Sequence, residues 1–367
     1  MRASLSLRLR TTVLPLVALA AACGESTTLF DPVVLSQNTD QIINAIDDSP
    51  AMQSMGVLGE KMTAGAAAQG APSLVAATMP HAELTAAGFP AWAAGRLQAV
   101  QATLPALAVA APGAVIPQEA LGKTFTYNEV DGIYVLSDRT GAPTNGVRFI
   151  LYAVNPVAHT VVTPLTEVGY VDLLDESSTS TIQLHLLAYI TASGTTPLID
   201  YTASATIQGL PTPTGATVTA TGYVSDGTNT VEFDLSQAFS TTTGIHVEYL
   251  LAIPEKDVEV GFEATYTLTQ QATVTLSVKH GGNTTIVAAS GTAASIAGTI
   301  KHNGDLVVNI TGSATSPVFA DASGNQLTPA QVAALQKLFD FTDDLLDHVD
   351  QMLAPAHGLL GIAGLVG

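Results

Sequence analysis

The sequence predicts a mainly β protein built on one large antiparallel meander. Between Lys123 and about Val318, apolar residues alternate with polar ones, as they do along strands that bury one face and solvate the other. Dipeptides typical of tight hairpins, such as Asp226-Gly227 and Asn303-Gly304, separate these runs. Hairpins join neighbouring antiparallel strands, so we expect about a dozen strands of roughly 7 to 12 residues, arranged in sequence order.

The alternation is clearest from Val258 to Leu268, where Val, Phe, Ala and Tyr occupy one phase and Glu, Gly and Thr the other. Residues 216–221 and 272–279 repeat it with threonine on the polar phase, which suits strands because threonine is β-branched. The run Val147–Val154 is apolar apart from Arg148, which predicts a central strand covered on both faces. A sheet of this size must curl, split into a sandwich or close into a barrel, and these three alternatives stay open.

A helical segment is expected before the β region. Residues 39–117 are rich in Ala, Met and Pro, and a helix start at Ser49-Pro50 precedes an apolar stripe. The stripe consists of Met52, Met55, Leu58 and Met62. A methionine stripe can line a binding groove, but its usual role is packing against the core, which we expect here.

The region after the meander predicts an amphipathic helix. Thr328-Pro329-Ala330-Gln331 combines an N-cap, a proline in the first turn and a capping-box glutamine, and Pro355 ends the helix. The natural place for the apolar stripe is against the sheet or inside the curl of the sheet. Its members are Val332, Leu335, Leu338, Phe339, Leu345, Leu346, Val349, Met352 and Leu353.

The N-terminus has the three parts of an export signal. Three arginines lie in the first ten residues, and the apolar stretch Val13–Ala22 is too short to remain as a membrane-spanning helix. It ends in Leu19-Ala20-Ala21-Ala22 before Cys23, and this tetrapeptide resembles the lipobox of bacterial lipoproteins. The resemblance implies cleavage before Cys23 and a diacylglyceryl thioether on its sulfur. The alternative is ordinary cleavage at the same alanines, which leaves Cys23 as a free thiol.

Cysteine usage favours the lipid anchor. Cys23 is the only cysteine in the sequence, so no internal disulfide can form. A lone thiol in an oxidising compartment is a liability, whereas a cysteine at the signal junction serves lipid attachment. Gly24 stands where an aspartate would retain a lipoprotein at the inner membrane. We therefore expect a protein held at the outer membrane of the cell envelope through the acyl chains on Cys23.

These features divide the chain into five parts. We expect a signal peptide (1–22), a lipidated tether (23–38), a helical segment (39–117), an antiparallel β domain (118–320) and an amphipathic helix with an apolar tail (321–367).

The signal peptide contains three of the twelve Lys and Arg residues and none of the 31 acids, so the mature chain has a formal net charge of −22. Such a charge opposes binding to nucleic acid.

No motif for catalysis, cofactor binding or metal binding is present, so we assign no residues to those roles. The sequence lacks a Gly-x-Ser-x-Gly elbow, a His-Glu-x-x-His pair and a phosphate-binding glycine loop. His185 and His246 lie on the polar phase of expected strands, where pairing across strands brings them near an acid such as Glu248 or Asp234.

Two acidic stripes could hold calcium, but we interpret both as solvated faces because neither comes from a loop that wraps an ion. The turn at residues 321–325 also contains residues that suit calcium, and it is equally typical of an ordinary turn. The stripes comprise Asp257, Glu259 and Glu263 on one strand, and Asp340, Asp343, Asp344, Asp347 and Asp350 on the C-terminal helix.

The sequence favours a non-enzymatic binding or structural module at the envelope, with an apolar ligand or an envelope protein as its partner. Its element order is similar to that of lipoprotein carriers of the LolA/LolB type, whose curved sheet has helices in its mouth. The resemblance implies an apolar ligand. The alternative is a secreted hydrolase that acts on glycans through strand carboxylates. Aromatic residues make up 5% of the chain, which counts against stacking on sugars.

The anchor assignment predicts a change of location on mutation. Replacing Cys23 with Ala removes the sulfur that would carry the lipid, so the protein should move from the membrane fraction to the soluble fraction. Mass analysis of the native N-terminal peptide should show acyl chains on Cys23. An unmodified thiol on that peptide contradicts the assignment.

Overall fold

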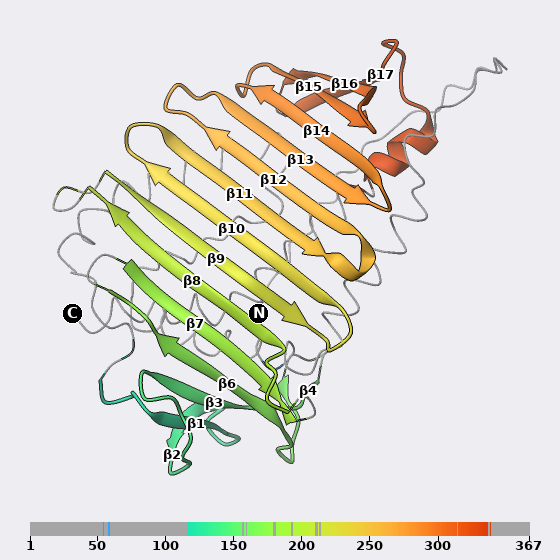
Figure 1. The fold of residues 1–367 in the computed structure, drawn as a ribbon. Helices are drawn as coiled ribbons and strands as arrows, with labels where there is room; N and C mark the ends of the chain where they lie inside the picture. Colours follow the sequence, from blue (N-terminus) through green and yellow to red (C-terminus); the bar gives the residue numbers. More distant parts are fainter. Residues whose placement is uncertain are drawn as a thin grey trace.

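A single large sheet dominates the fold (Figure 1). The computed structural model describes residues 118–336 together with residues 54, 58, 116 and 338. Within the range 118–336 it leaves out residues 156–157, 159, 179–180, 192–193, 210–211, 213 and 314. The main sheet has fifteen strands, and from β6 to β17 each strand pairs antiparallel with the next one in sequence. The predicted fold class, a mainly β protein with a large antiparallel meander, is confirmed.

The strands of the main sheet lie in the order β17-β16-β15-β14-β13-β12-β11-β10-β9-β8-β7-β6-β3-β1-β2. Most are longer than ordinary strands, which fits the long alternating runs of the sequence. β4 (Val154–Asn155) and β5 (Thr160–Val161) form a separate small sheet. The others are β1 (Lys123–Asn128), β2 (Ile133–Ser137), β3 (Gly146–Tyr152), β6 (Glu167–Asp175), β7 (Thr181–Ile190), β8 (Ile199–Gln208), β9 (Gly215–Ser225), β10 (Thr230–Ser240), β11 (Gly244–Ile253), β12 (Val258–Tyr266), β13 (Ala272–His280), β14 (Asn283–Gly291), β15 (Ile296–His302), β16 (Asp305–Ser313) and β17 (Ser316–Asp321).

The sheet is open and twisted, with β17 and β2 at its two edges (Figure 1). Of the three alternatives left by the sequence, closure into a barrel is therefore wrong, and the strands form one hydrogen-bonded sheet rather than two. One pairing departs from the meander, because β1 inserts beside β3 and runs parallel to it. The hairpin turns are where the sequence places them. Asn303 and Gly304, for example, both have positive φ, as the tightest hairpins require.

β3 is covered on both faces, as predicted, but it is not central. It lies third from the β2 edge of the sheet. Tyr134 of β2 reaches over β1 and packs on the Phe149 side of β3, which is the side that joins the core. The Tyr134 hydroxyl donates to the Ile150 carbonyl at 3.1 Å, and its ring meets Phe149 edge-on. Burial raises the pKa of the Tyr134 hydroxyl, with smaller contributions from Tyr152 and Tyr127, so this donor stays protonated.

One face of the meander is apolar and buried. β12 shows this most clearly, because residues of even number such as Val260 and Phe262 are buried and alternate with exposed Glu259 and Glu263. Leu268 lies beyond the end of this strand and is exposed, so the predicted run is two residues too long. Leu58, from the predicted N-terminal helical segment, belongs to the same buried cluster as the strands. Ser54 and Leu58 are both helical, and the rest of that segment lies outside the described residues.

A helix follows the sheet and begins at Pro329, beside the β13–β17 end (Figure 1). Its capping box forms as predicted: Gln331 Oε1 accepts from the Thr328 N–H at 2.8 Å, and Thr328 Oγ1 accepts from the Gln331 N–H at 3.3 Å. Leu335 and Leu338 are buried in the core, which confirms these two stripe positions.

Val332 does not belong to the buried stripe, because its side chain is 41% exposed. At 3.6 residues per turn it lies about 120° around the helix from Leu338. Ala334 is buried in its place. The stripe positions beyond Leu338 and the acidic face at residues 340–350 lie outside the described residues.

The helix offers a matched test of the packing. Leu335→Ala removes a buried side chain from the core and should lower the free energy of unfolding by about 2 to 4 kcal/mol. Val332→Ala, one turn away on the exposed side, should change it by no more than about 0.5 kcal/mol. Urea unfolding of both variants measures the difference. Equal losses contradict the assignment of the buried face.

Candidate functional site

The polar phase of the strands forms one broad accessible face of the sheet. Strand register aligns its side chains in rows that run across many strands. Hydroxyl groups on this face bond between neighbouring strands, as Ser204 and Thr219 do at 2.8 Å. One such row contains Gln183, Ser204, Thr219, Ser236, Glu248, Glu263, Thr275, Ala288, Thr299 and Asn309.

Tyrosines and charged groups gather on this face over β3 and β6–β9. We call this set the tyrosine cluster, and it is the strongest candidate site in the described part of the chain. The pairing of five neighbouring strands builds it from residues far apart in sequence. Its members are Arg148, Tyr170, Asp172, Glu176, His185, Tyr189, Asp200 and Tyr223.

Arg148 organises one side of the tyrosine cluster. It lies opposite Asp172 in register, and its Nε and a terminal nitrogen each lie 2.7 Å from an oxygen of the Asp172 carboxylate. The Arg148 guanidinium also lies 3.8 Å above the ring of Tyr170, which in turn stacks on Tyr189 with ring centroids 4.9 Å apart. Asp172 is only 8% exposed, so this two-point ion pair holds a nearly buried carboxylate in place.

His185 lies between two carboxylates on the other side of the cluster. Its Nε2 lies 2.7 Å from Asp200 Oδ1, and its Nδ1 lies 3.4 Å from Glu176 Oε1. The sequence predicted an acid beside His185, and that expectation is confirmed, but the named partners were wrong. They differ because register places Asp200 and Glu176, rather than Glu248 or Asp234, beside the imidazole.

His246 and Asp234 are placed differently. His246 Nε2 lies 3.9 Å from Glu248 Oε2, two residues along the same strand, and not across strands as expected. Asp234 accepts instead from the hydroxyl of Thr221 on the neighbouring strand.

The phenols of Tyr189 and Tyr223 remain hydrogen-bond donors at neutral pH. Burial is the largest cause that raises the pKa of each hydroxyl, and the negative charge of Asp200 raises both further. Asp200 lies directly opposite Tyr223 on the adjacent strand. The Tyr223 hydroxyl already donates to the Pro197 carbonyl at 3.4 Å. The cluster therefore combines protonated phenols with carboxylate acceptors on a partly exposed surface, which suits recognition of a ligand with many hydroxyl groups.

The predicted acidic stripe does not converge on one point, and Asp257 lies before β12, at the end of the 3-10 helix Pro254–Lys256, rather than on the strand as expected. The Asp257 carboxylate accepts from the Gly282 N–H at 3.1 Å, and Glu259 lies 3.7 Å from the Lys279 ammonium. Glu263 lies opposite Glu248. Asp321 accepts from the N–H groups of Ser323 and Asn325, as in an ordinary turn. Within the described ranges, no group of three or more His, Cys, Asp or Glu residues is arranged to hold a metal ion.

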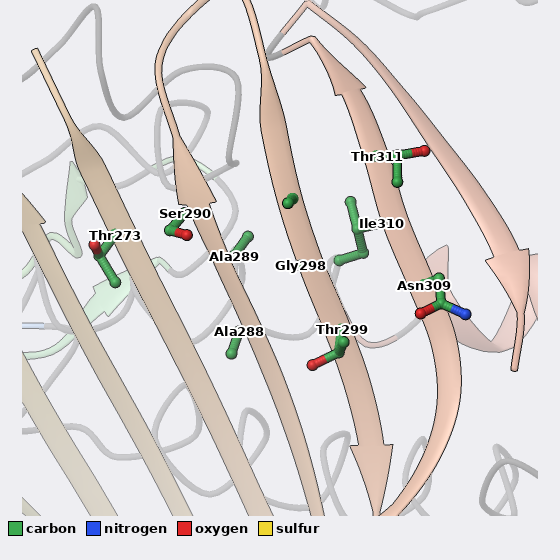
Figure 2. A pocket seen from close by; sticks show the side chains of 10 residues that line it. Thr273, Ala288, Ala289, Ser290, Gly298, Thr299, Asn309, Ile310 and Thr311 are labelled. Carbon is green, nitrogen blue, oxygen red and sulfur yellow. The ribbon is translucent and has the colours of Figure 1, made fainter.

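An open depression of about 470 Å³ lies on β13–β16 (Figure 2). The strand order places it at the opposite end of the sheet from the tyrosine cluster. The depression forms because most of the residues that line it have small side chains, namely Ala, Gly, Ser and Thr. Neither the depression nor the cluster can be predicted from the sequence, because both depend on strand register. The lining residues are Thr273, Ala288, Ala289, Ser290, Ala297, Gly298, Thr299, Asn309, Ile310 and Thr311.

Cys23, the lipidation site expected from the sequence, lies outside the described residues. In the part of the chain that the structure describes, no helix is both long and apolar enough to cross a membrane. The anchor therefore stays a prediction.

The two arginine ion pairs give a matched stability test. Arg148→Met leaves the Asp172 carboxylate nearly buried without its cation, and should cost about 3 kcal/mol of unfolding free energy. Arg139→Met breaks the ion pair with Glu167. The side chains of Arg139 and Glu167 are both about half exposed, so the free energy of unfolding should fall by less than about 1 kcal/mol. Chemical denaturation measures both costs. A loss for Arg148→Met no larger than that for Arg139→Met contradicts the structural role of the buried pair.

Comparison with known proteins adds no relative from which a function can be carried over. No family model matches the chain, and no curated protein or solved structure matches it either. Its function must therefore be argued from the residues of the chain itself.

Proposed function

We propose that this protein is a non-enzymatic binding module of the bacterial envelope, anchored through lipid on Cys23, that holds a glycan on the polar face of its sheet. The observation that carries the proposal is the tyrosine cluster. It places Tyr189 and Tyr223 beside Asp200 on an accessible surface, with His185 orienting the carboxylate. The outer membrane is the proposed location, as the residue after Cys23 suggests.

The choice of a polar ligand follows from which face is accessible. The apolar face of the sheet is packed into one continuous cluster that includes Leu58, Leu335 and Leu338. An apolar ligand on that face must displace these contacts, and each displaced leucine costs on the order of 2 kcal/mol of burial. The polar face presents hydroxyls, phenols and carboxylates without such a penalty. A polar ligand on the polar face is therefore better supported than the apolar ligand expected from the sequence.

A glycan suits this surface because its hydroxyl groups both donate and accept hydrogen bonds. Carboxylates and hydroxyls of the face accept and donate in turn, and tyrosine rings add apolar contact for the C–H groups of a sugar. The rows of side chains run across many strands, so the surface favours an extended chain over a compact molecule. The depression on β13–β16 lies on the same sheet, but its lining is mainly apolar, so we do not count it as part of the glycan surface.

Hydrolysis of the glycan is the second candidate, and one arrangement favours it. Asp172 and Asp200 lie in one row with Leu187 between them, so their backbones are about 10 Å apart. Glycosidases use two carboxyl groups on either side of the scissile bond. However, Asp172 is held by Arg148 and nearly buried, which leaves it poorly placed to protonate or attack a sugar. Binding without turnover is therefore our proposal.

The experiment measures binding of the full chain to a panel of bacterial envelope polysaccharides by calorimetry. Asp200→Asn removes one charge-assisted acceptor from the cluster and should weaken binding about tenfold, the cost of one hydrogen bond to a charged group. Asp234→Asn is the control, because it removes a carboxylate from the same face outside the cluster. This control should bind like the unaltered protein.

Three results contradict the proposal. Equal weakening by the two variants means that general charge, and not the cluster, binds the polysaccharide. Uptake of a fluorescent fatty acid without polysaccharide binding supports the apolar ligand instead. Cleavage of the polysaccharide that is lost in Asp200→Asn supports the hydrolase.

A further inference from the structure

The strands from β6 to β11 contain acids but neither lysine nor arginine. From residue 149 to residue 255 the sequence has ten Asp and Glu residues and no lysine or arginine, and this stretch includes all six strands. Arg148, which reaches the tyrosine cluster from β3, is bound to Asp172. The accessible face over these strands therefore has a negative potential, which attracts cations and repels anions.

Tyr223 lies between two of these acids. Strand register places Asp200 of β8 opposite Tyr223 on one side and Glu232 of β10 opposite it on the other. Side chains in such positions have Cβ atoms about 5 Å apart, so each carboxyl group lies within side-chain reach of the ring. The bond from the Tyr223 hydroxyl to the Pro197 carbonyl holds the ring in place. An aromatic ring with a carboxylate on either side suits a cation, because the ring face and both charges attract it.

Ion pairs within the chain do not account for the acids around Tyr223. The basic group bonded to Asp200 is the His185 imidazole, whose other ring nitrogen lies 3.4 Å from Glu176. A neutral imidazole has one N–H, so it can donate to only one of these two carboxylates. Glu232 is exposed, and in the part of the chain that the structure describes it forms no ion pair.

We propose that the tyrosine cluster selects a glycan that carries protonated amino groups, and that one ammonium group lies over Tyr223 between Asp200 and Glu232. This inference rests on the proposed function, because it names the class of glycan that the same site takes. A sugar ammonium group donates up to three hydrogen bonds, which matches carboxylate acceptors on two sides. An N-acetylated sugar has a neutral amide at that position, so it offers no charge to either carboxylate.

The charge of the chain argues against an anionic glycan. The formal net charge is −19 at pH 7, so a polysaccharide that carries phosphate or carboxylate groups is repelled. A basic peptide is attracted by the same field, but a lysine peptide lacks the ring hydroxyls that the serine, threonine and tyrosine side chains of this face can bond. A cationic glycan satisfies both the charge and the hydroxyl groups of the surface.

The test compares two sugars that differ only in acetylation of their amino groups. Calorimetry of the full chain in weakly acidic buffer measures binding of a glucosamine hexamer, which is cationic, and of its fully N-acetylated form. The N-acetylated hexamer should bind at least about tenfold more weakly, because it loses a hydrogen bond between charged groups. A lysine hexamer carries a similar charge without sugar rings, and it should also bind at least about tenfold more weakly than the glucosamine hexamer.

A matched pair of variants locates the ammonium group. Glu232→Gln removes one carboxylate beside Tyr223, and should weaken binding of the glucosamine hexamer about tenfold without changing binding of the N-acetylated form. Glu263→Gln removes the same charge from β12, where Glu263 lies opposite Glu248 and away from Tyr223, so this control should bind like the unaltered protein. Both glutamates are exposed, so folding should survive, and circular dichroism checks that it does.

Four results overturn the inference: equal binding of the two sugar hexamers, equal binding of the lysine hexamer, equal weakening by the two variants, or no binding of the glucosamine hexamer. The proposed function is decided separately by the polysaccharide panel. Polysaccharide binding that depends on Asp200 but not on amino groups removes this inference and leaves the proposed function intact. Absence of binding to every polysaccharide and to both sugar hexamers removes both.

Discussion

Burial of one apolar face along successive strands is the constraint on which the rest of this structure depends. Each strand alternates with a period of two, so one phase joins the core and the other must face solvent. A shift of register by one residue would exchange the two faces, which fixes the pairing from β6 to β17. Leu58 and the Leu335–Leu338 turn pack on the buried face, where a lone sheet of this size would otherwise expose apolar surface to water.

The same register that buries the core also creates the candidate site. Tyr170 meets Tyr189, and Asp200 meets Tyr223, only because their strands are aligned residue by residue. The polar face is therefore an ordered array whose spacing is set by the backbone, not a random solvated surface. Arg148 adds rigidity by holding Asp172 on one side and covering Tyr170 on the other. Preorganisation of this kind lowers the entropy cost of ligand binding.

The sequence predicts the local features of this fold well, since each depends on neighbouring residues. The alternation in β12, the turn at Asn303-Gly304 and the capping box at Thr328 and Gln331 are of this kind. Features that depend on distant residues were missed. The insertion of β1 beside β3 moved β3 from the centre toward an edge, and register decided that the acid beside His185 is Asp200. The tyrosine cluster has no sequence motif, because five strands contribute to it.

The central claim is that the ligand binds the polar face while the apolar face remains packed. Hydrogen–deuterium exchange of the full chain, with and without a bound envelope polysaccharide, tests it most directly. The account predicts slower exchange in β6–β9 on binding and unchanged exchange in the helix that begins at Pro329, because that helix packs on the opposite face. Altered exchange in this helix, with β6–β9 unaffected, would place the ligand between the helix and the sheet and contradict the account.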